Sequence, residues 1–171
     1  ANLSTSRMID DIAARAGGRV IRTPVGEAHV ANAMIQHDCV IGGEGNGGVI
    51  DLRVGPIRDS LVGMALILQR MAETGKTVSG LVQDVGGYYM YKDKFAANSQ
   101  QAKRITELAA EQFADAAANT SDGLRLDFVD GWVHLRTSNT EPVMRVIVEA
   151  KDESAAGRYI QAVSEIGRAH V

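Results

Sequence analysis

The stretch LRLDFVDGWVHL, residues 124–135, decides the fold of the second half of the chain. Apolar residues occupy alternate positions from 124 to 128, and the alternation returns at 133 and 135. Such alternation is typical of strands with one buried face. Asp130 and Gly131, between the two runs, favour a two-residue type I′ turn. This turn predicts a hairpin with the pairs Val129–Trp132, Asp127–His134 and Arg125–Arg136.

The hairpin is flanked on both sides by further regular elements. An extended aromatic segment, Tyr88–Phe95, precedes a helix that Asn98 is expected to cap. A strand over Met144–Ala150 precedes a final helix that starts near Ser154. These elements predict an α+β domain with a four-stranded antiparallel sheet and two helices on one face, similar to the TATA-box-binding-like fold. We place this domain at residues 87–164.

Residues 1–86 alternate helical and short extended segments, which is the signature of an α/β layer. The helix after Asp59 is apolar almost all round, so we expect it to be buried against a sheet. Gly86 and Gly87 mark the predicted boundary with the next domain. The first domain is therefore predicted to be an α/β/α layered domain with a mixed sheet. Its expected strands are Val20–Arg22 and Cys39–Gly42, and its other helices start near Met8, run over residues 26–37 and cover Thr77–Val85.

Both ends of the chain carry signs of truncation. Residues 1–6, ANLSTS, are typical of the tail of a strand whose apolar beginning is missing. The last seven residues, EIGRAHV at 165–171, match the in-frame translation of a common sequencing-library adapter. We predict that residues 165–171 are foreign to the protein.

The composition is that of a folded globular chain of 171 residues with a formal net charge of -3. Such a charge provides no general basic field for a nucleic acid backbone, so we expect no nucleic acid partner. No apolar run approaches the roughly 20 residues that cross a bilayer, and no signal peptide is visible. The one cysteine, Cys39, forms no internal disulfide and is predicted to be a small core residue. We expect a cytoplasmic setting and no membrane partner.

The segment RTSNTEPVMR, Arg136–Arg145, combines two arginines with a hydroxyl-rich turn. Guanidinium groups bind phosphate in a planar, bidentate manner, and short polar side chains with backbone N–H groups line anion-binding turns. Arg125, predicted to lie opposite Arg136, is an unfavourable neighbour unless an anion sits near them. The alternative is a solvated β-turn with surface arginines.

The segment GGEGNGG, Gly42–Gly48, is a glycine-rich loop after a predicted strand. Such loops often bind phosphate, but the carboxylate of Glu44 would repel an anion. Together with the amide of Asn46 it is better suited to hydrogen-bonding sugar hydroxyls. The alternative is a plain glycine-rich connection.

Arg22 ends a predicted strand, at the edge where ligand sites of α/β sheets lie. His29 falls within a helical pattern and is predicted to lie on a helix face. The sequence contains no Cys/His cluster, HExxH motif or GKS/T phosphate loop. We therefore expect this segment to hold no metal.

The two loops together carry a family resemblance. RTSNTEPVMR resembles the phosphate-binding loop of the last domain of the α-D-phosphohexomutases, and GGEGNGG resembles the sugar-binding loop of their third domain. The motifs stand in the family's order and spacing, and the resemblance covers essentially residues 1–164. It implies that residues 1–86 are the third and residues 87–164 the fourth domain of such an enzyme.

The resemblance implies an intramolecular phosphotransferase that interconverts hexose 6-phosphate and 1-phosphate through a bisphosphorylated sugar, which also serves as activator. The reactive phosphoserine and the loop that binds Mg²⁺ belong to the family's first two domains, so this fragment is expected to be inactive alone. Its implied partners are a hexose phosphate and those missing N-terminal domains. The first candidate activity is phosphoglucosamine mutase, although Ala28 departs from that subgroup's usual arginine. The alternatives are phosphomannomutase/phosphoglucomutase and, in a different class, a non-catalytic anion-binding module.

By the same resemblance, individual residues inherit roles. Glu44 and Asn46 inherit sugar binding. Arg22 is the nearest match to a basic residue that assists proton transfer, although an arginine stays charged and is a poor proton donor. The phosphate-binding residues are predicted to be Arg136, Ser138, Asn139, Thr140 and Arg145.

Overall fold

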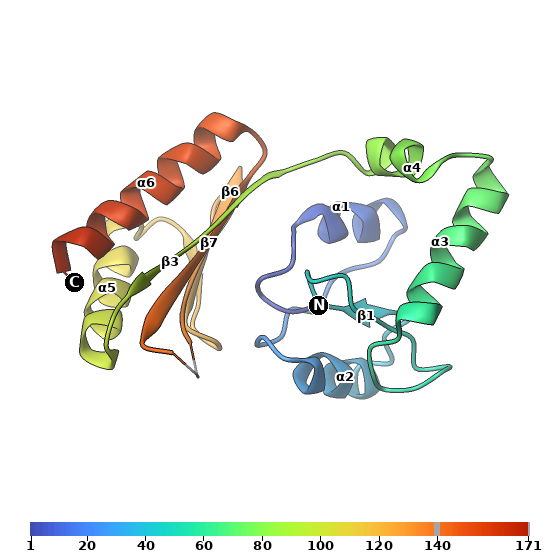
Figure 1. The fold of residues 1–171 in the computed structure, drawn as a ribbon, viewed down its shortest axis with the longest axis horizontal. Helices are drawn as coiled ribbons and strands as arrows, with labels where there is room; N and C mark the ends of the chain where they lie inside the picture. Colours follow the sequence, from blue (N-terminus) through green and yellow to red (C-terminus); the bar gives the residue numbers. More distant parts are fainter. Residues whose placement is uncertain (139–140, 171) are drawn as a thin grey trace. The chain divides into compact units, whose positions relative to one another are not determined.

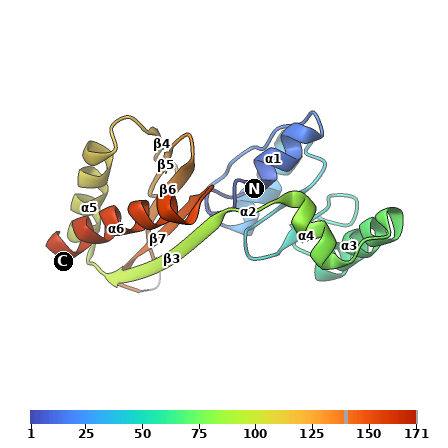
Figure 2. The same ribbon diagram turned by 90° about the horizontal axis from the view of Figure 1, so that it is seen from above.

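The structure, a computed structural model, describes residues 1–138 and 141–170. The chain divides into two compact units, residues 1–87 and residues 88–171, and each is described by itself. Figures 1 and 2 show the ribbon of both units from two directions.

Unit 1 begins with an extended segment whose Asn2 forms a parallel bridge with Thr23. Helix α1 covers Met8–Arg15, and helix α2 covers Glu27–Gln36. Two short strands, β1 (Gly42–Gly43) and β2 (Val49–Ile50), pair antiparallel around the glycine-rich loop. The core of this unit is small and consists of Val30, Ala31, Met34 and Ile50.

Helix α3 (Ser60–Thr74) begins directly after Asp59, as the sequence predicted. The Asp59 side chain caps its N-terminus, and Gly75 ends it in the left-handed conformation. Helix α4 covers Val78–Val85 after Thr77, whose hydroxyl accepts a hydrogen bond from the Gly80 N–H. The predicted positions of the helices in this unit are therefore confirmed.

Three predictions for unit 1 were wrong, and they concern two strands and the burial of one helix. The predicted strand Cys39–Gly42 is not buried, since Val40 is 90% exposed, and strand pairing starts only at Gly42. Helix α3 is not buried either, because Leu61 and Leu68 are 72% and 63% exposed. The reason is physical. Within the described residues the sheet of this unit consists of two-residue strands, which are too short to cover a helix of 15 residues.

The predicted strand Val20–Arg22 also does not form, because pairing there is limited to the Asn2–Thr23 bridge. In place of the predicted mixed sheet, the described residues of unit 1 form a two-stranded antiparallel sheet and one isolated parallel bridge. The α/β class of the chain is confirmed.

Unit 2 is an antiparallel sheet with strand order β3-β7-β6-β5-β4. Strand β4 is a short edge strand that the sequence analysis missed, so the sheet has five strands instead of four. The bounds are β3 Tyr89–Ala96, β4 Ala117–Asn119, β5 Leu124–Asp127, β6 Gly131–Thr137 and β7 Val143–Ala150.

Helices α5 (Ser99–Gln112) and α6 (Glu153–His170) cover one face of this sheet, as predicted (Figure 1). Asn98 and Gln101 form a capping box at the start of α5. Ile105 of α5, Val163 of α6 and Val133 of β6 all lie in one buried core cluster. Helix α6 continues through residues 165–170, and Ile166 is buried in this core. The predicted foreign origin of residues 165–171 stays a prediction.

The predicted register of the hairpin was wrong by two residues. Asp127 pairs with Trp132 and Arg125 with His134, so the loop spans four residues, 128–131. The cause lies in the neighbouring strand. Gly131 pairs with Ala150 of β7, and a Cβ on Gly131 would lie 2.4 Å from the Glu149 carbonyl oxygen. This close approach requires glycine within strand β6 and overrides the local preference for a two-residue turn.

Candidate functional site

The two candidate phosphate arginines lie directly opposite one another on neighbouring strands. Arg136 of β6 pairs with Arg145 of β7, and both side chains leave the sheet on the face away from α5 and α6. The predicted opposition of Arg125 and Arg136 is replaced by this pair. Two arginines across a ladder repel each other unless an anion lies between them. The observed register therefore places Arg136 and Arg145, two of the predicted phosphate-binding residues, side by side.

A third cation extends this row. Lys94 of β3 pairs with Arg145 on the other side of β7. We call Arg136, Arg145 and Lys94 the cationic row. The Nζ of Lys94 lies 3.9 Å from a carboxylate oxygen of Glu141, and both side chains are more than half exposed. A pair that exposed holds its partners weakly, so Lys94 remains available to an anion.

Sequence reasoning missed Lys94 because its position depends on pairing between segments about 50 residues apart. The signal was the alternation of Lys92 and Lys94 in Tyr88–Phe95, which places both lysines on one face of a strand. A pocket of about 330 Å³ lies beside the row. Its lining consists of Lys92, Asp93, Lys94, Arg145, Val146 and Ile147.

The Nε atom of Arg136 is buried and makes no hydrogen bond within the described residues. The nearest carboxylate oxygen, from Asp122, lies 3.5 Å away, which is longer than the roughly 2.7–2.9 Å of a charge-assisted hydrogen bond. Ser138 follows β6, and its backbone N–H donates to the Val143 carbonyl at 2.9 Å. The predicted phosphate residues Asn139 and Thr140 lie outside the described residues.

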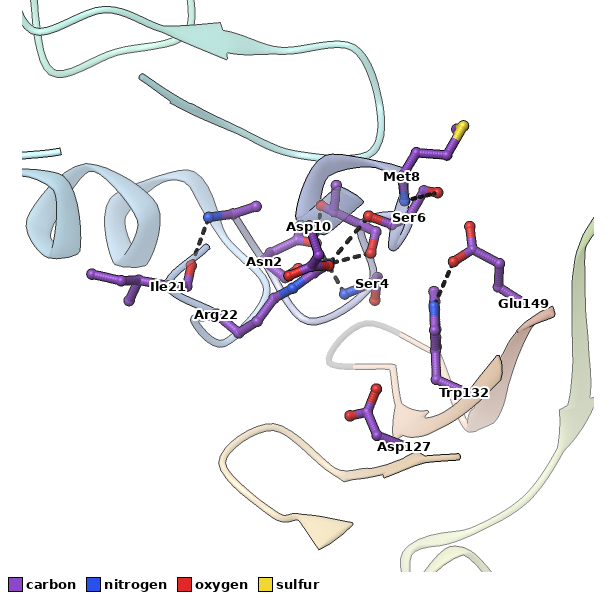
Figure 3. Close-up of polar contacts among 12 residues, drawn as sticks. Asn2, Ser4, Ser6, Met8, Asp10, Ile21, Arg22, Asp127, Trp132 and Glu149 are labelled. Atoms are coloured by element: carbon purple, nitrogen blue, oxygen red, sulfur yellow. Dashed lines mark hydrogen bonds and ion pairs between the residues drawn. The ribbon is translucent and has the colours of Figure 1, made fainter. Parts of the chain in front are cut away.

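The face that carries the cationic row also holds a buried polar cluster. The indole Nε1–H of Trp132 donates to Glu149 at 2.6 Å, a contact drawn in Figure 3. The guanidinium of Arg125 lies 4.3 Å from the Trp132 ring centroid and donates two hydrogen bonds to Asp127. The positive charge of Arg125 is therefore neutralised by the carboxylate of Asp127. Arg125 therefore stabilises this polar cluster and does not lie opposite Arg136.

His134 is buried on the same face of β6, two residues before Arg136. Its Nε2 lies 2.7 Å from the Asp122 carbonyl oxygen, and because a carbonyl only accepts, Nε2 carries the proton. Burial lowers the pKa of His134, and the carbonyl contact opposes this shift. His134 is therefore neutral near pH 7 and adds no charge to the row.

In unit 1 the Glu44 carboxylate is held from three sides. It accepts hydrogen bonds from Asn2 Nδ2 at 2.8 Å and from the Gly26 N–H at 3.1 Å. The Nη1 of Arg58 lies 3.4 Å from its second oxygen. With its side chain 8% exposed, Glu44 is a fixed acceptor instead of a mobile surface acid. Asn46, in the same loop, accepts from the Gly48 N–H at 3.0 Å and thereby shapes the turn.

Arg58 connects Glu44 to a second carboxylate, that of Glu27. Its backbone N–H and its Nε each donate to Glu27 at 2.7 Å. The backbone hydrogen bond and then the guanidinium lower the pKa of Glu27, and the same side-chain contact raises the pKa of Arg58. Sequence reasoning missed Arg58, because the 13 residues between Glu44 and Arg58 give no sign that they meet.

The Arg22 guanidinium is surrounded by carbonyl groups of the first residues. It donates to the carbonyls of Asn2 and Thr5 at 3.0 and 2.6 Å and to that of Ser6 at 3.1 Å. It also pairs with the Asp10 carboxylate (Figure 3). These contacts give Arg22 a structural task in the N-terminal segment, and its role in proton transfer stays a prediction.

Across residues 1–138 and 141–170, no three metal-ligating side chains gather closely enough to hold an ion. Among the same residues, the helices are all too short or too polar to cross a membrane.

Comparisons with known proteins agree with this geometry. Residues 1–88 match the sequence profile of the phosphoglucomutase/phosphomannomutase alpha/beta/alpha domain III, and residues 97–166 match that of the family's C-terminal domain. The chain therefore belongs to the phosphoglucomutase/phosphomannomutase family, as the two loops predicted.

Curated relatives carry two kinds of name. A phosphoglucomutase/phosphomannomutase of Thermococcus kodakarensis is 38% identical over 93% of this chain, and a probable phosphoglucosamine mutase of Methanopyrus kandleri is 33% identical over 91%. The chain spans 35% of the length of each of these relatives.

The fold matches that of a solved phosphoglucomutase/phosphomannomutase family protein from Burkholderia thailandensis. The TM-score is 0.83 at 22% identity, over 99% of this chain and 36% of the other. A putative phosphomannomutase from Thermus thermophilus matches with a TM-score of 0.68.

Proposed function

We propose that this chain supplies the sugar-binding and phosphate-binding loops of a phosphohexomutase, an enzyme that interconverts hexose 6-phosphate and 1-phosphate through a bisphosphorylated sugar. The cationic row is the observation that carries the proposal. Three cations on neighbouring strands destabilise the sheet unless an anion neutralises them. A phosphate with its several acceptor oxygens suits two guanidinium groups and an ammonium.

In this proposal the row, with Ser138, Asn139 and Thr140, binds the phosphate that is not reacting. Because the sugar bisphosphate turns over between two transfers, the same residues bind the 1-phosphate and the 6-phosphate in turn. Such positioning accounts for much of the barrier reduction in phosphoryl transfer.

Glu44 is proposed to accept hydrogen bonds from sugar hydroxyls. Its fixed position supports this role, because a carboxylate that is already oriented loses little conformational freedom on binding. Asn46 contributes by shaping the turn and by presenting its amide. Arg22 is not assigned a step, because its described contacts are with the N-terminal segment.

Phosphoryl transfer itself is proposed to require residues outside this chain. The sequence contains no TASHNP-like serine segment and no DGDxDR-type metal loop. Among the described residues, no group of three or more metal-ligating side chains could hold an ion. The chain's own contribution is therefore to bind and orient the sugar phosphate.

The proposed substrate is glucosamine phosphate, as in the relatives named phosphoglucosamine mutase. Glucose and mannose phosphates are the second candidates, and the observation that supports them is the 38% identity to the Thermococcus kodakarensis protein. The two classes differ at C2 of the sugar.

A chimera tests the proposal. Residues 1–164 replace the matching C-terminal part of the Thermococcus kodakarensis relative, and mutase activity is measured with the three hexose phosphates. We expect turnover, and Arg136→Ala should lower kcat/KM by about 2 kcal/mol or roughly 30-fold, because charge-assisted hydrogen bonds to the phosphate are lost.

Arg104→Ala provides the matched control, because Arg104 is an exposed arginine on helix α5 whose nearest ion-pair partner is Glu107. It should leave kcat/KM unchanged. Equal kinetics of the Arg136→Ala variant and the unmodified chimera would refute the phosphate role. Phosphate binding by a folded chimera without turnover would instead favour the non-catalytic anion-binding module.

A further inference from the structure

We propose that Asp122 is a positioning residue for Arg136, and that the turn at Asp122 and Gly123 is built to hold it there. The inference rests on the proposed phosphate role of Arg136 and adds a residue to which neither the sequence motifs nor the family profiles assign a task. Asp122 precedes strand β5, outside both recognised loops.

The first observation is the environment of Arg136 itself. Its side chain is 18% exposed, and its Nε is buried without a hydrogen bond in the described part of the chain. A buried donor that lacks a partner costs roughly 1–3 kcal/mol. The carboxylate of Asp122, 3.5 Å from this atom, is near enough to attract the guanidinium and too distant to saturate it. This contact is on the Nε side of the guanidinium, and the forked Nη end is the part proposed to bind phosphate.

The second observation is that Asp122 is fixed by contacts of its backbone. Its carbonyl accepts the Nε2–H of the buried His134 at 2.7 Å. His134 precedes Arg136 by two residues on the same face of β6. Strand β6, which carries Arg136, thus also holds the backbone of Asp122 in place.

The third observation is Gly123, which has a left-handed φ of +73°. A Cβ at this position would lie 2.2 Å from the Leu135 carbonyl oxygen and 3.0 Å from the Arg136 Cα. Only glycine allows the turn to approach strand β6 so closely. This approach brings the preceding residue, Asp122, beside Arg136.

Together these contacts define how Asp122 acts. It attracts the Nε side of the guanidinium and so restricts the rotamers of a long side chain before the phosphate arrives. Pre-organisation of this kind reduces the conformational entropy lost on binding. Asp122 is not proposed to touch the substrate, since a carboxylate facing the phosphate would repel it.

A double-mutant cycle in the full 171-residue chain tests the inference, with inorganic phosphate and glucose 6-phosphate as probes in NMR titrations. We expect Asp122→Asn to weaken the binding of both probes by about tenfold, the scale of one contact to a charged group. In the Arg136→Ala background the same substitution should change affinity less than twofold, because its target is gone. Equal losses in both backgrounds would overturn the inference, as would no loss in the unmodified background.

The design separates this inference from the function on which it rests. If Arg136→Ala leaves phosphate affinity unchanged, the proposed function fails and the positioning role falls with it. If Arg136→Ala weakens binding but Asp122→Asn does not, the positioning role fails alone.

A second readout requires no ligand. The ¹⁵Nε resonance of Arg136 should shift in Asp122→Asn and return toward its original position in Asp122→Glu, which restores the charge. An unchanged Nε resonance would contradict the inference directly. Fluorescence of Trp132, the chain's one tryptophan, establishes that each variant is folded. The Asp122 carbonyl that binds His134 is retained in both variants.

Discussion

At the scale of single residues, Arg58 shows how Glu44 and the glycine-rich loop Gly42–Gly48 are held in place. One guanidinium contacts both Glu27 and Glu44, so the orientation of Glu44 depends on a residue from a different part of unit 1. Arg53 offers a matched comparison, because it pairs with Asp51 and holds the pKa of that carboxyl at about 2.

These two pairs lead to a prediction for carboxyl titrations. Arg58→Met should raise the pKa of Glu27 toward its ordinary value of 4.5, but not completely, because the larger cause of its depression is the backbone N–H of residue 58. Since that pKa is lowered by folding, its stabilising contribution is present above about pH 4.5 and is lost as the pH falls. NMR titration of the side-chain carboxyls in the 171-residue chain measures the shift.

Arg53→Met is the control for this titration. It should raise the pKa of Asp51 from about 2 and leave Glu27 unchanged. If the pKa of Glu27 changed in the Arg53→Met variant, or did not change in the Arg58→Met variant, the ion pair between Arg58 and Glu27 would not be formed in solution.

Residue patterns indicated part of the candidate site and missed other residues that the structure places beside it, for definable reasons. Arg136 and Arg145 were found because both flank one turn, so a short segment contains the signal. Lys94 and Asp122 were missed because their places depend on strand pairing and on a glycine turn. Lysine and aspartate are common on surfaces. The register of β3 and β7 places Lys94 next to Arg145, and the turn at Gly123 brings Asp122 beside Arg136.

At the scale of elements, local chemistry predicted the helices better than the strand register. The caps of α3, α4 and α5 involve residues within a few positions, and the structure contains all three. The hairpin turn depended on tertiary contacts instead. The carboxylate of Asp130 accepts a hydrogen bond from the Tyr159 hydroxyl at 2.6 Å, and its carbonyl accepts one from the Lys151 N–H. Asp130 is therefore held by residues beyond the hairpin.

Helix α3 provides a test of capping in an exposed helix. The Asp59 carboxylate accepts from the N–H groups of Leu61 and Val62 at 2.8 and 3.1 Å. Because packing contributes little to this helix, Asp59→Ala should destabilise it by about 1 kcal/mol. Hydrogen exchange of the α3 amides should then accelerate by about fivefold.

Asp59→Ser is the matched variant, because serine also caps helices well. Its exchange rates should stay close to those of the unmodified chain. Equal acceleration in the alanine and serine variants would mean that the cap hydrogen bonds do not support α3.

At the scale of the whole molecule, the two units have very different cores. Unit 2 buries apolar residues from two helices and from strands β5, β6 and β7 in one cluster. Unit 1 buries a cluster of four, Val30, Ala31, Met34 and Ile50, while α3 and α4 expose large apolar side chains. Hydrophobic burial is the main favourable term in folding, so stability should be concentrated in unit 2.

Hydrogen exchange followed by mass spectrometry on the 171-residue chain measures this distribution. Peptides from β6 and β7 should exchange at least about a hundredfold more slowly than peptides from α3 and α4, because exchange in a well-packed core requires global unfolding. Comparable protection of α3 would contradict the prediction and would mean that its apolar face is covered in solution. Repeating the measurement at several protein concentrations distinguishes self-association from packing within one chain, since only self-association makes the protection depend on concentration.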